Sequence, residues 1–249
     1  MGKVDTYRET LKKLEDWDQF LLEKSCLPGP RANLELVEAV AEEGNQSQFM
    51  RYLSFDSEKA PVGSVYEFLA VCGVVGLGRL INEGNKTLLV TLRSFASDVR
   101  WRVREAVAMA LQRVGESNMD ELLKETVEWS KGSLLEKRAV VAAICEPKLL
   151  NQHQEIHRVL EILDKITYDL LNEENRKNED LKVLRKALGY GWSVVVVASP
   201  VEGKKLLEKW FMNEDKDIRW IMKENLRKNR LNKMDPDWIG RWKAELGVK

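Results

Sequence analysis

The 249-residue sequence lacks an excess of charge of either sign and any long uninterrupted apolar run. Forty Lys and Arg residues balance forty Asp and Glu residues, and 44% of the chain is hydrophobic. This hydrophobic content excludes a disordered chain, which combines low hydrophobicity with high net charge. The longest apolar run, from Phe68 to Leu77, is interrupted by glycines and followed by Arg79. It is far shorter than the roughly 20 residues of a membrane-spanning helix, so no membrane association is expected.

Cysteine and histidine are also scarce. The three cysteines (Cys26, Cys72 and Cys145) lie far apart in the sequence. An odd, scattered set excludes a disulfide framework and a cysteine-based zinc site, and predicts reduced thiols in the cytoplasm. No charged leader with an apolar stretch and a cleavage site opens the chain, so we do not expect a secreted protein.

Apolar residues recur at helical spacing along most of the chain. In residues 5–24 and again in 101–114 they fall three or four positions apart, which places them on one face of a helix. The six prolines stand where such patterns start or stop, and we expect helix caps at four residues: Asp98, Asn118, Asp217 and Asp235. The β-branched run Val194–Val197 lies inside a helically spaced segment, 181–198, and no partner strand is evident. We therefore predict a buried helix there and an all-α fold.

Two segments 119 residues apart are similar. Asp98-Val-Arg-Trp-Arg-Val-Arg-Glu-Ala-Val107 aligns with Asp217-Ile-Arg-Trp-Ile-Met-Lys-Glu-Asn-Leu226, with Asp, Arg, Trp and Glu identical. A weaker third copy begins at Arg138. One helix pair cannot bury its apolar face alone, so similar pairs stack into a continuous core. The separation corresponds to about three units of roughly 40 residues, the length of HEAT and armadillo repeats.

These observations predict an α-α superhelix, a HEAT/armadillo-like solenoid that forms one domain over residues 1–249. Within it we expect an N-terminal polar cap (1–56), repeats (57–150), an insertion ending in a mobile loop (151–180), further repeats (181–234) and a C-terminal cap (235–249). Trp238 and Trp242, four residues apart, are expected to seal the last repeat.

Two motifs suggest chemistry but fit a structural role better. Gly73, Gly76 and Gly78 resemble a phosphate-binding loop, yet no Lys-Ser/Thr pair and no preceding strand accompany them. We interpret them as small residues that let two helices approach closely. His153 and His157 share a helix face that Glu161 continues, but the segment is polar and we interpret it as a solvated helix face rather than a zinc site. We therefore predict no bound metal and no cofactor.

Basic residues gather in the two similar segments. Residues 219–233 hold six Lys and Arg against Glu224 alone. Around the earlier segment, four arginines stand against Glu105: Arg100, Arg102, Arg104 and Arg113. If the equivalent helices line one concave surface, their cations would meet phosphates. The candidate nucleic-acid-binding residues are Arg100, Arg104, Lys223, Arg227 and Arg230. The alternative is that these cations form ordinary solvated helix faces.

The repeat pattern, together with Trp101 and Glu105 one helical turn apart, resembles the HEAT-like DNA alkylation repair proteins, the AlkC/AlkD-like DNA glycosylases. This resemblance implies a curved solenoid that holds DNA in its concave face. It also implies that Trp101 lies beside the damaged nucleotide, that Glu105 stabilises the cationic sugar, and that Arg138 contacts a phosphate, with Trp192 as a second aromatic wall. The family uses Asp where this chain has Glu105. Glu224 is the equivalent residue in the other segment, so a role of Glu105 in the repeat itself stays open.

Three functions follow as hypotheses. The first is a non-enzymatic scaffold whose concave face holds a protein or nucleic-acid partner, and the second is an alkylpurine DNA glycosylase that uses Glu105, Trp101 and Arg138. The third is a metal-dependent activity at His153 and His157. The first is preferred because helical repeats serve many binding functions and no strong catalytic constellation is present.

Overall fold

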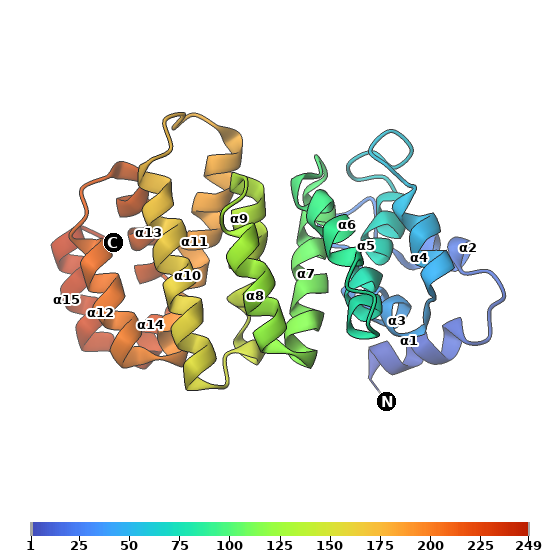
Figure 1. The fold of residues 1–249 in the computed structure, drawn as a ribbon, viewed down its shortest axis with the longest axis horizontal. Coiled ribbons are helices and arrows are strands. Elements are labelled where there is room, and N and C mark those ends of the chain that lie inside the picture. Colours follow the sequence, from blue (N-terminus) through green and yellow to red (C-terminus); the bar gives the residue numbers. More distant parts are fainter. Residues whose placement is uncertain (1, 249) are drawn as a thin grey trace. The chain divides into compact units, whose positions relative to one another are not determined.

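The computed structural model describes residues 2–248 of the chain, which form fifteen α-helices, two short 3₁₀ helices and no strand (Figure 1). The predicted all-α class is confirmed. No helix among these residues is both long and apolar enough to cross a lipid bilayer. The chain divides into two compact units, residues 1–117 and 118–249. The division at residue 117 falls inside the repeat segment predicted over 57–150.

Unit 1 contains seven α-helices, of which α5 is central. They are α1 (Lys3–Leu11), α2 (Asp18–Lys24), α3 (Leu34–Glu43), α4 (Gln46–Leu53), α5 (Glu67–Asn82), α6 (Leu88–Ser94) and α7 (Trp101–Ser117). Helix α1 packs on α3, α3 on α5 and α5 on α7, while α2, α4 and α6 also pack against α5. Fourteen of the sixteen residues of α5 are buried, so this helix is the core around which the unit is built.

The glycines of α5 allow these close contacts. A Cβ on Gly76 would lie 2.5 Å from the Phe49 ring of α4, and a Cβ on Gly78 would lie 2.5 Å from the carbonyl oxygen of Ala110 in α7. A helix can approach a ring or another helix backbone this closely only at a glycine, which has no Cβ. The interpretation of this motif as a packing device is confirmed.

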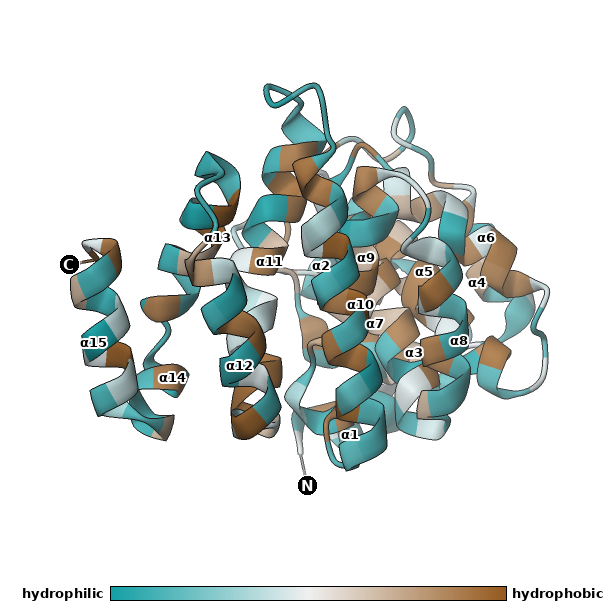
Figure 2. Cartoon of the chain, turned by 60° about the vertical axis from the view of Figure 1, so that its left-hand side comes forward, coloured by the Kyte–Doolittle hydropathy of each residue, from teal (hydrophilic) through white to brown (hydrophobic). Residues whose placement is uncertain are grey.

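Unit 2 consists of two rows of helices. Its elements are α8 (Met119–Trp129), α9 (Leu134–Ile144), α10 (His153–Leu171), α11 (Glu179–Ala198), α12 (Pro200–Phe211), α13 (Lys216–Leu226), α14 (Asn229–Met234) and α15 (Pro236–Leu246). Helix α11 packs extensively between α9 and α13, and α10 packs against α8 and α12. Val194–Val196 are buried in α11, as predicted. Along their length the helices in Figure 2 alternate between hydrophobic and hydrophilic residues, which is typical of amphipathic helices.

The segment predicted as an insertion packs against the rest of unit 2. Its helix α10 buries eight residues, including Ile156, Leu163 and Ile166, and contacts four neighbouring helices. The loop after it is held in place by Arg176, whose guanidinium donates hydrogen bonds to Asp215 and Asp217. Helix α10 is therefore part of the core of unit 2.

The two ends of the chain also contribute to the core. Residues 2–56, predicted as a polar cap, contain α1–α4, and Phe49 and Tyr52 among them are fully buried. The expected helix over 5–24 is broken between α1 and α2, where the indole N–H of Trp17 donates to the Leu11 carbonyl. At the other end, Trp238 and Trp242 pack on Phe211 of α12, with ring centroids 5.8 and 4.8 Å apart.

Two of the four predicted caps are observed as predicted. Asn118 caps α8 and Asp235 caps α15, each accepting a hydrogen bond from a backbone N–H of the first turn. Helix α13 begins earlier than expected and is capped by Asp215, so Asp217 lies inside its first turn. Asp98 accepts the backbone N–H of Arg100, just ahead of α7.

Candidate functional site

The arginines of the first basic segment form hydrogen bonds with other groups of unit 1. Arg100 is 1% exposed, and its guanidinium forms a two-point contact with Asp98 and donates to the carbonyls of Phe55, Asp56 and Ala60. Arg104 donates to the carbonyls of Asp98 and Val99. The burial of Arg100 does not fit the expected phosphate contact, because a phosphate would have to displace this whole set of hydrogen bonds.

Trp101 and Glu105 lie one turn apart on α7, as the sequence predicts, and the structure shows that both are exposed. The Trp101 side chain is 44% exposed, and the guanidinium of Arg102 lies 4.4 Å from its ring centroid. Arg102 itself is buried, paired at 3.0 Å with the fully buried Glu67, and it donates to the carbonyl of Gly29. The buried ion pair with Glu67 thus fixes the position of the Arg102 guanidinium, which forms a cation–π contact with the exposed Trp101 ring.

The other two residues implied by the family resemblance lie in unit 2 and are both buried. Arg138 in α9 is 8% exposed. Trp192 in α11 is fully buried, and its indole N–H donates to Thr167 of α10. The burial of Trp192 does not fit a residue that forms a wall of a binding site, because its ring is part of the core. Trp101 and Glu105 therefore remain the accessible part of the implied catalytic set.

Trp220, the repeat equivalent of Trp101, is supported in the same manner. The guanidinium of Arg185 in α11 lies 4.5 Å from the Trp220 centroid and donates to Asp217, which is 3% exposed. The helical position differs, because Trp101 is the first residue of α7 whereas Trp220 is the fifth of α13. Both copies of the sequence repeat therefore share one local arrangement: a tryptophan ring stacks on an arginine, and a buried carboxylate pairs with that arginine.

Basic and aromatic side chains from α11, α13 and α14 form one surface of unit 2. The guanidinium of Arg230 lies 4.5 Å from the Tyr190 ring centroid and donates to its hydroxyl, while Arg185 joins α11 to Trp220 of α13. Residues three or four apart share a helix face, which adds Lys186 beside Tyr190, and Lys223 and Arg227 beyond Trp220. We call this set the basic–aromatic surface: Arg185, Lys186, Tyr190, Trp220, Lys223, Arg227 and Arg230.

Part of the charge on this surface is not neutralised. Lys186 and Lys223 form no ion pair with any described residue, and Arg230 is held by a tyrosine rather than by a carboxylate. Glu224 lies beside Arg227 at 2.5 Å and Lys228 at 3.8 Å. Sequence reasoning found Lys223, Arg227 and Arg230 but missed Lys186 and Tyr190. Their spacing of four residues in a predicted helix was the signal that could have revealed them.

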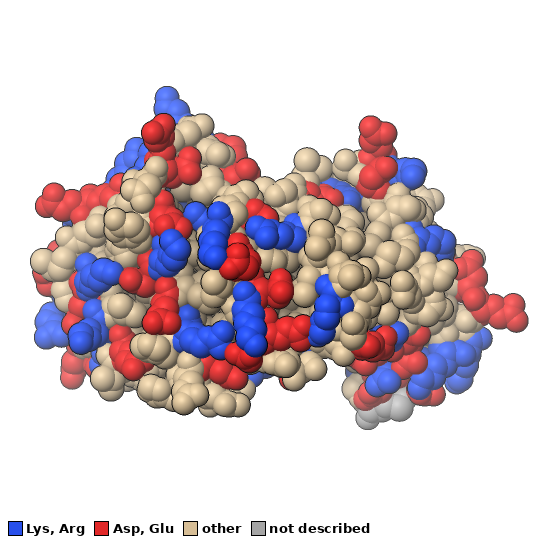
Figure 3. Space-filling view, in the orientation of Figure 1, with Lys and Arg blue, Asp and Glu red and all other residues tan. Residues whose placement is uncertain are grey.

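The face that α8, α10 and α12 form in the same unit is different. Its cations and anions alternate (Figure 3), and they pair with one another. Arg158 bonds Asp120 at 2.7 Å, and Lys209 bonds Asp164 at 2.9 Å. Paired surface charges contribute little attraction for a polyanion, so the basic–aromatic surface is the candidate nucleic-acid interface.

The two histidines lie on α10, and His157 lines a cavity of about 450 Å³ beside α12. His157 Nδ1 is 3.4 Å from Glu202, its Nε2 is 3.5 Å from Glu161, and His153 Nε2 is 3.8 Å from Glu202. Both imidazoles are more than half exposed. Among residues 2–248 no group of three or more His, Cys, Asp or Glu side chains is placed to hold a metal ion, so these contacts form a surface cluster.

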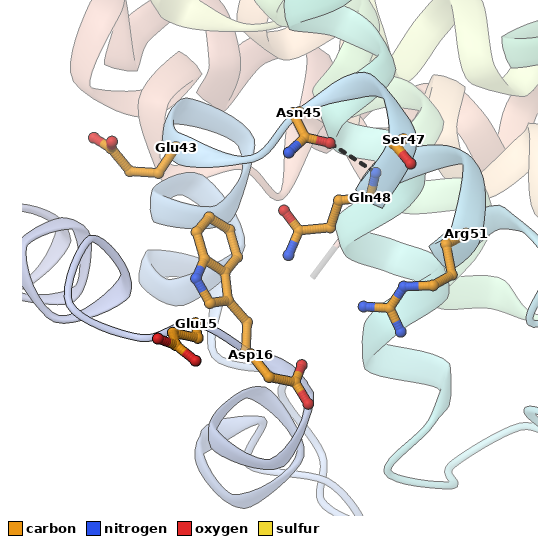
Figure 4. Close-up of a pocket in the computed structure, with 8 residues that line it drawn as sticks. Glu15, Asp16, Glu43, Asn45, Ser47, Gln48 and Arg51 are labelled. Atoms are coloured by element: carbon orange, nitrogen blue, oxygen red, sulfur yellow. Dashed lines mark hydrogen bonds between the residues drawn. The ribbon is translucent and has the colours of Figure 1, made fainter.

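A second cavity, of about 430 Å³, lies in unit 1 where the loop between α1 and α2 faces the start of α4. Figure 4 shows Glu15 and Asp16 on one side of it and Asn45, Ser47 and Gln48 on the other. Trp17, Glu43 and Arg51 complete the lining. Arg51 forms a two-point hydrogen bond with Asp18, at 2.5 and 2.8 Å, which holds the pKa of the Asp18 carboxyl below its ordinary value.

Comparisons of the chain with protein-family models, with curated proteins and with solved structures give no match.

Proposed function

We propose that the protein is a helical-repeat scaffold that binds a nucleic acid through the basic–aromatic surface of unit 2. One combination of side chains supports this proposal. Lys186 and Lys223 have no carboxylate partner among the described residues, and beside them two aromatic rings each form a cation–π contact with an arginine. Lys and Arg side chains attract the phosphate backbone, and aromatic or guanidinium planes stack on bases. The row of α9, α11 and α13 supports a HEAT-like solenoid as the architecture that presents this surface.

A triple substitution tests the proposal. Changing Lys186, Lys223 and Arg230, which have no carboxylate partner among the described residues, to Gln is expected to weaken binding to a fluorescent duplex or single strand at least tenfold at low salt, because three phosphate contacts are lost. The salt dependence should also fall, by about one unit of slope for each lost contact. Fluorescence anisotropy at two salt concentrations measures both effects.

The matched control removes three cations from the other face of the same unit. Lys124, Lys131 and Lys165 each pair with a nearby carboxylate on their own helix or at its end. Their change to Gln alters the net charge by the same amount and should leave binding nearly unchanged. Equal weakening by both triple variants would show that net charge alone governs binding. If the wild-type protein does not bind nucleic acid even at low salt, the nucleic-acid proposal is wrong and a protein becomes the partner to look for.

An alkylpurine DNA glycosylase is the second candidate function, because Trp101 and Glu105 are both exposed one turn apart on α7. In such a reaction the carboxylate stabilises the positive charge that develops on the sugar as the alkylated base departs. Glu105→Gln is expected to reduce release of methylated purines from duplex DNA more than a hundredfold while leaving unfolding unchanged. If the wild-type protein releases no methylated purine, this candidate is removed and the scaffold function is unaffected.

A further inference from the structure

The cavity between the loop 12–17 and α4 in unit 1 has chemistry opposite to that of the basic–aromatic surface. The arginine of its lining and the arginine that bonds its third carboxylate already have carboxylate partners. Arg51 is tied to Asp18 by two hydrogen bonds, and Arg8 bonds the third carboxylate of the lining, Glu43, at 2.6 Å. These cations have little attraction left for an anionic ligand.

The groups that remain available in the cavity are hydrogen-bond acceptors. Glu15 forms no ion pair and no hydrogen bond with any described residue, and Asp16 accepts only the backbone N–H of Asp18, at 3.1 Å. Gln48 uses its side-chain NH₂ to donate to the Tyr52 hydroxyl at 3.1 Å, which leaves its carbonyl oxygen free to accept. Two carboxylates and an amide oxygen around one cavity favour a cationic ligand that carries several N–H donors.

Trp17 contributes an apolar surface to this lining. It is 9% exposed, and its indole N–H points to the interior, where it donates to the Leu11 carbonyl at 3.0 Å. The ring therefore offers its carbon atoms to the cavity and no donor. A flat cation can stack on such a ring. The orientation of the indole ring is fixed by the hydrogen bond from its N–H to the Leu11 carbonyl.

We propose that this cavity binds the guanidinium group of an arginine side chain from a basic peptide. A guanidinium is planar, stacks on aromatic rings and carries five N–H donors in one plane, whereas an ammonium is a compact and strongly hydrated charge. The volume of about 430 Å³ lies in the range of side-chain and small-ligand sites. Glu15 and Asp16 bind the charged end, Gln48 accepts an N–H, and Trp17 packs against the plane.

Calorimetric titration with N-acetyl-arginine methylamide tests the site, because this probe has no charged termini. The citrulline analogue is its neutral isostere, and the lysine analogue carries an ammonium instead. We expect the arginine probe to bind at least tenfold more tightly than the citrulline probe and more tightly than the lysine probe. Equal binding of arginine and citrulline, tighter binding of lysine, or no binding of arginine would each overturn the proposal.

Variants locate the binding in this cavity. Glu15→Gln combined with Asp16→Asn should weaken arginine binding at least tenfold. The control, Glu35→Gln with Glu58→Gln, removes two exposed carboxylates elsewhere in unit 1 and should leave binding unchanged. Equal loss in both double variants would overturn the assignment to this cavity. Because neither variant touches the basic–aromatic surface, nucleic-acid binding and arginine binding can fail independently.

Discussion

Replacing Gly78 with Ala is expected to lower the free energy of unfolding by about 2–3 kcal/mol. The new Cβ would lie 2.5 Å from the Ala110 carbonyl oxygen and 2.9 Å from its Cα, in the backbone of α7. Backbone atoms of a packed helix cannot rotate away as a side chain does, so α5 and α7 would have to separate along their extensive contact. Urea unfolding followed by circular dichroism measures the loss.

Gly240 in α15 provides the control. A Cβ there meets no atom within 4 Å, and alanine is preferred over glycine in a helix interior by about 0.5–1 kcal/mol. Gly240→Ala should therefore stabilise the protein slightly. Since both substitutions gain the same helix preference, the difference between them reports the close approach at Gly78. Unfolding of Gly78→Ala that matches Gly240→Ala would show that the glycine is not needed for packing.

The glycine motif shows what sequence can predict about this fold. The absence of a following Lys-Ser/Thr pair and of a preceding strand was enough to reject a phosphate loop, and an apolar run with small residues is sufficient to predict a buried helix. The same holds for Val194–Val197, where the spacing of the surrounding residues outweighed local β-propensity. Patterns that extend over three or more turns determine helix identity reliably.

The ends of the helices are harder to predict, because neighbouring side chains compete for the same backbone groups. Asp215 and Asp217 are both good capping residues two positions apart, and the helix starts at the first of them. Residues 12–17 have helical spacing, yet Asp16 accepts the N–H of Asp18 in a turn and Trp17 bonds back to Leu11, which ends α1. Side chains that bond the nearby backbone offer the chain an alternative to the helix.

The candidate sites depend on contacts that no local pattern contains. Tyr190 and Arg230 are forty residues apart, and the cavity beside Trp17 joins two separate segments of unit 1, residues 15–17 and 43–51. Sequence could place the cations on helices, but it could not show which of them a carboxylate neutralises. The charge left over after pairing, rather than the count of Lys and Arg, distinguishes the basic–aromatic surface from the face of α8, α10 and α12.

Arg100 and Arg219 are equivalent in the sequence repeat, and their substitution by Ala is expected to have very different effects. Arg100→Ala should destabilise the protein by about 3–5 kcal/mol, the range seen when one member of a buried ion pair is removed. The substitution leaves the Asp98 carboxylate, 13% exposed, without its cation, and removes the shared donor of three carbonyls at residues 55, 56 and 60. Arg219 is exposed, and Arg219→Ala should change stability by less than about 0.5 kcal/mol.

Arg100→Lys separates the charge from the geometry of the guanidinium. A lysine keeps the positive charge, but a single ammonium cannot form the two-point contact with Asp98 and reach the carbonyls of the 55–60 loop at once. It should therefore recover only a minor part of the loss, as measured by urea unfolding. Full recovery of stability in Arg100→Lys would mean that the positive charge alone matters at this position. Equal losses of stability in Arg100→Ala and Arg219→Ala would mean that the two equivalent arginines have the same role. The structure instead predicts that one copy holds unit 1 together while the other remains at the surface, where a partner can reach it.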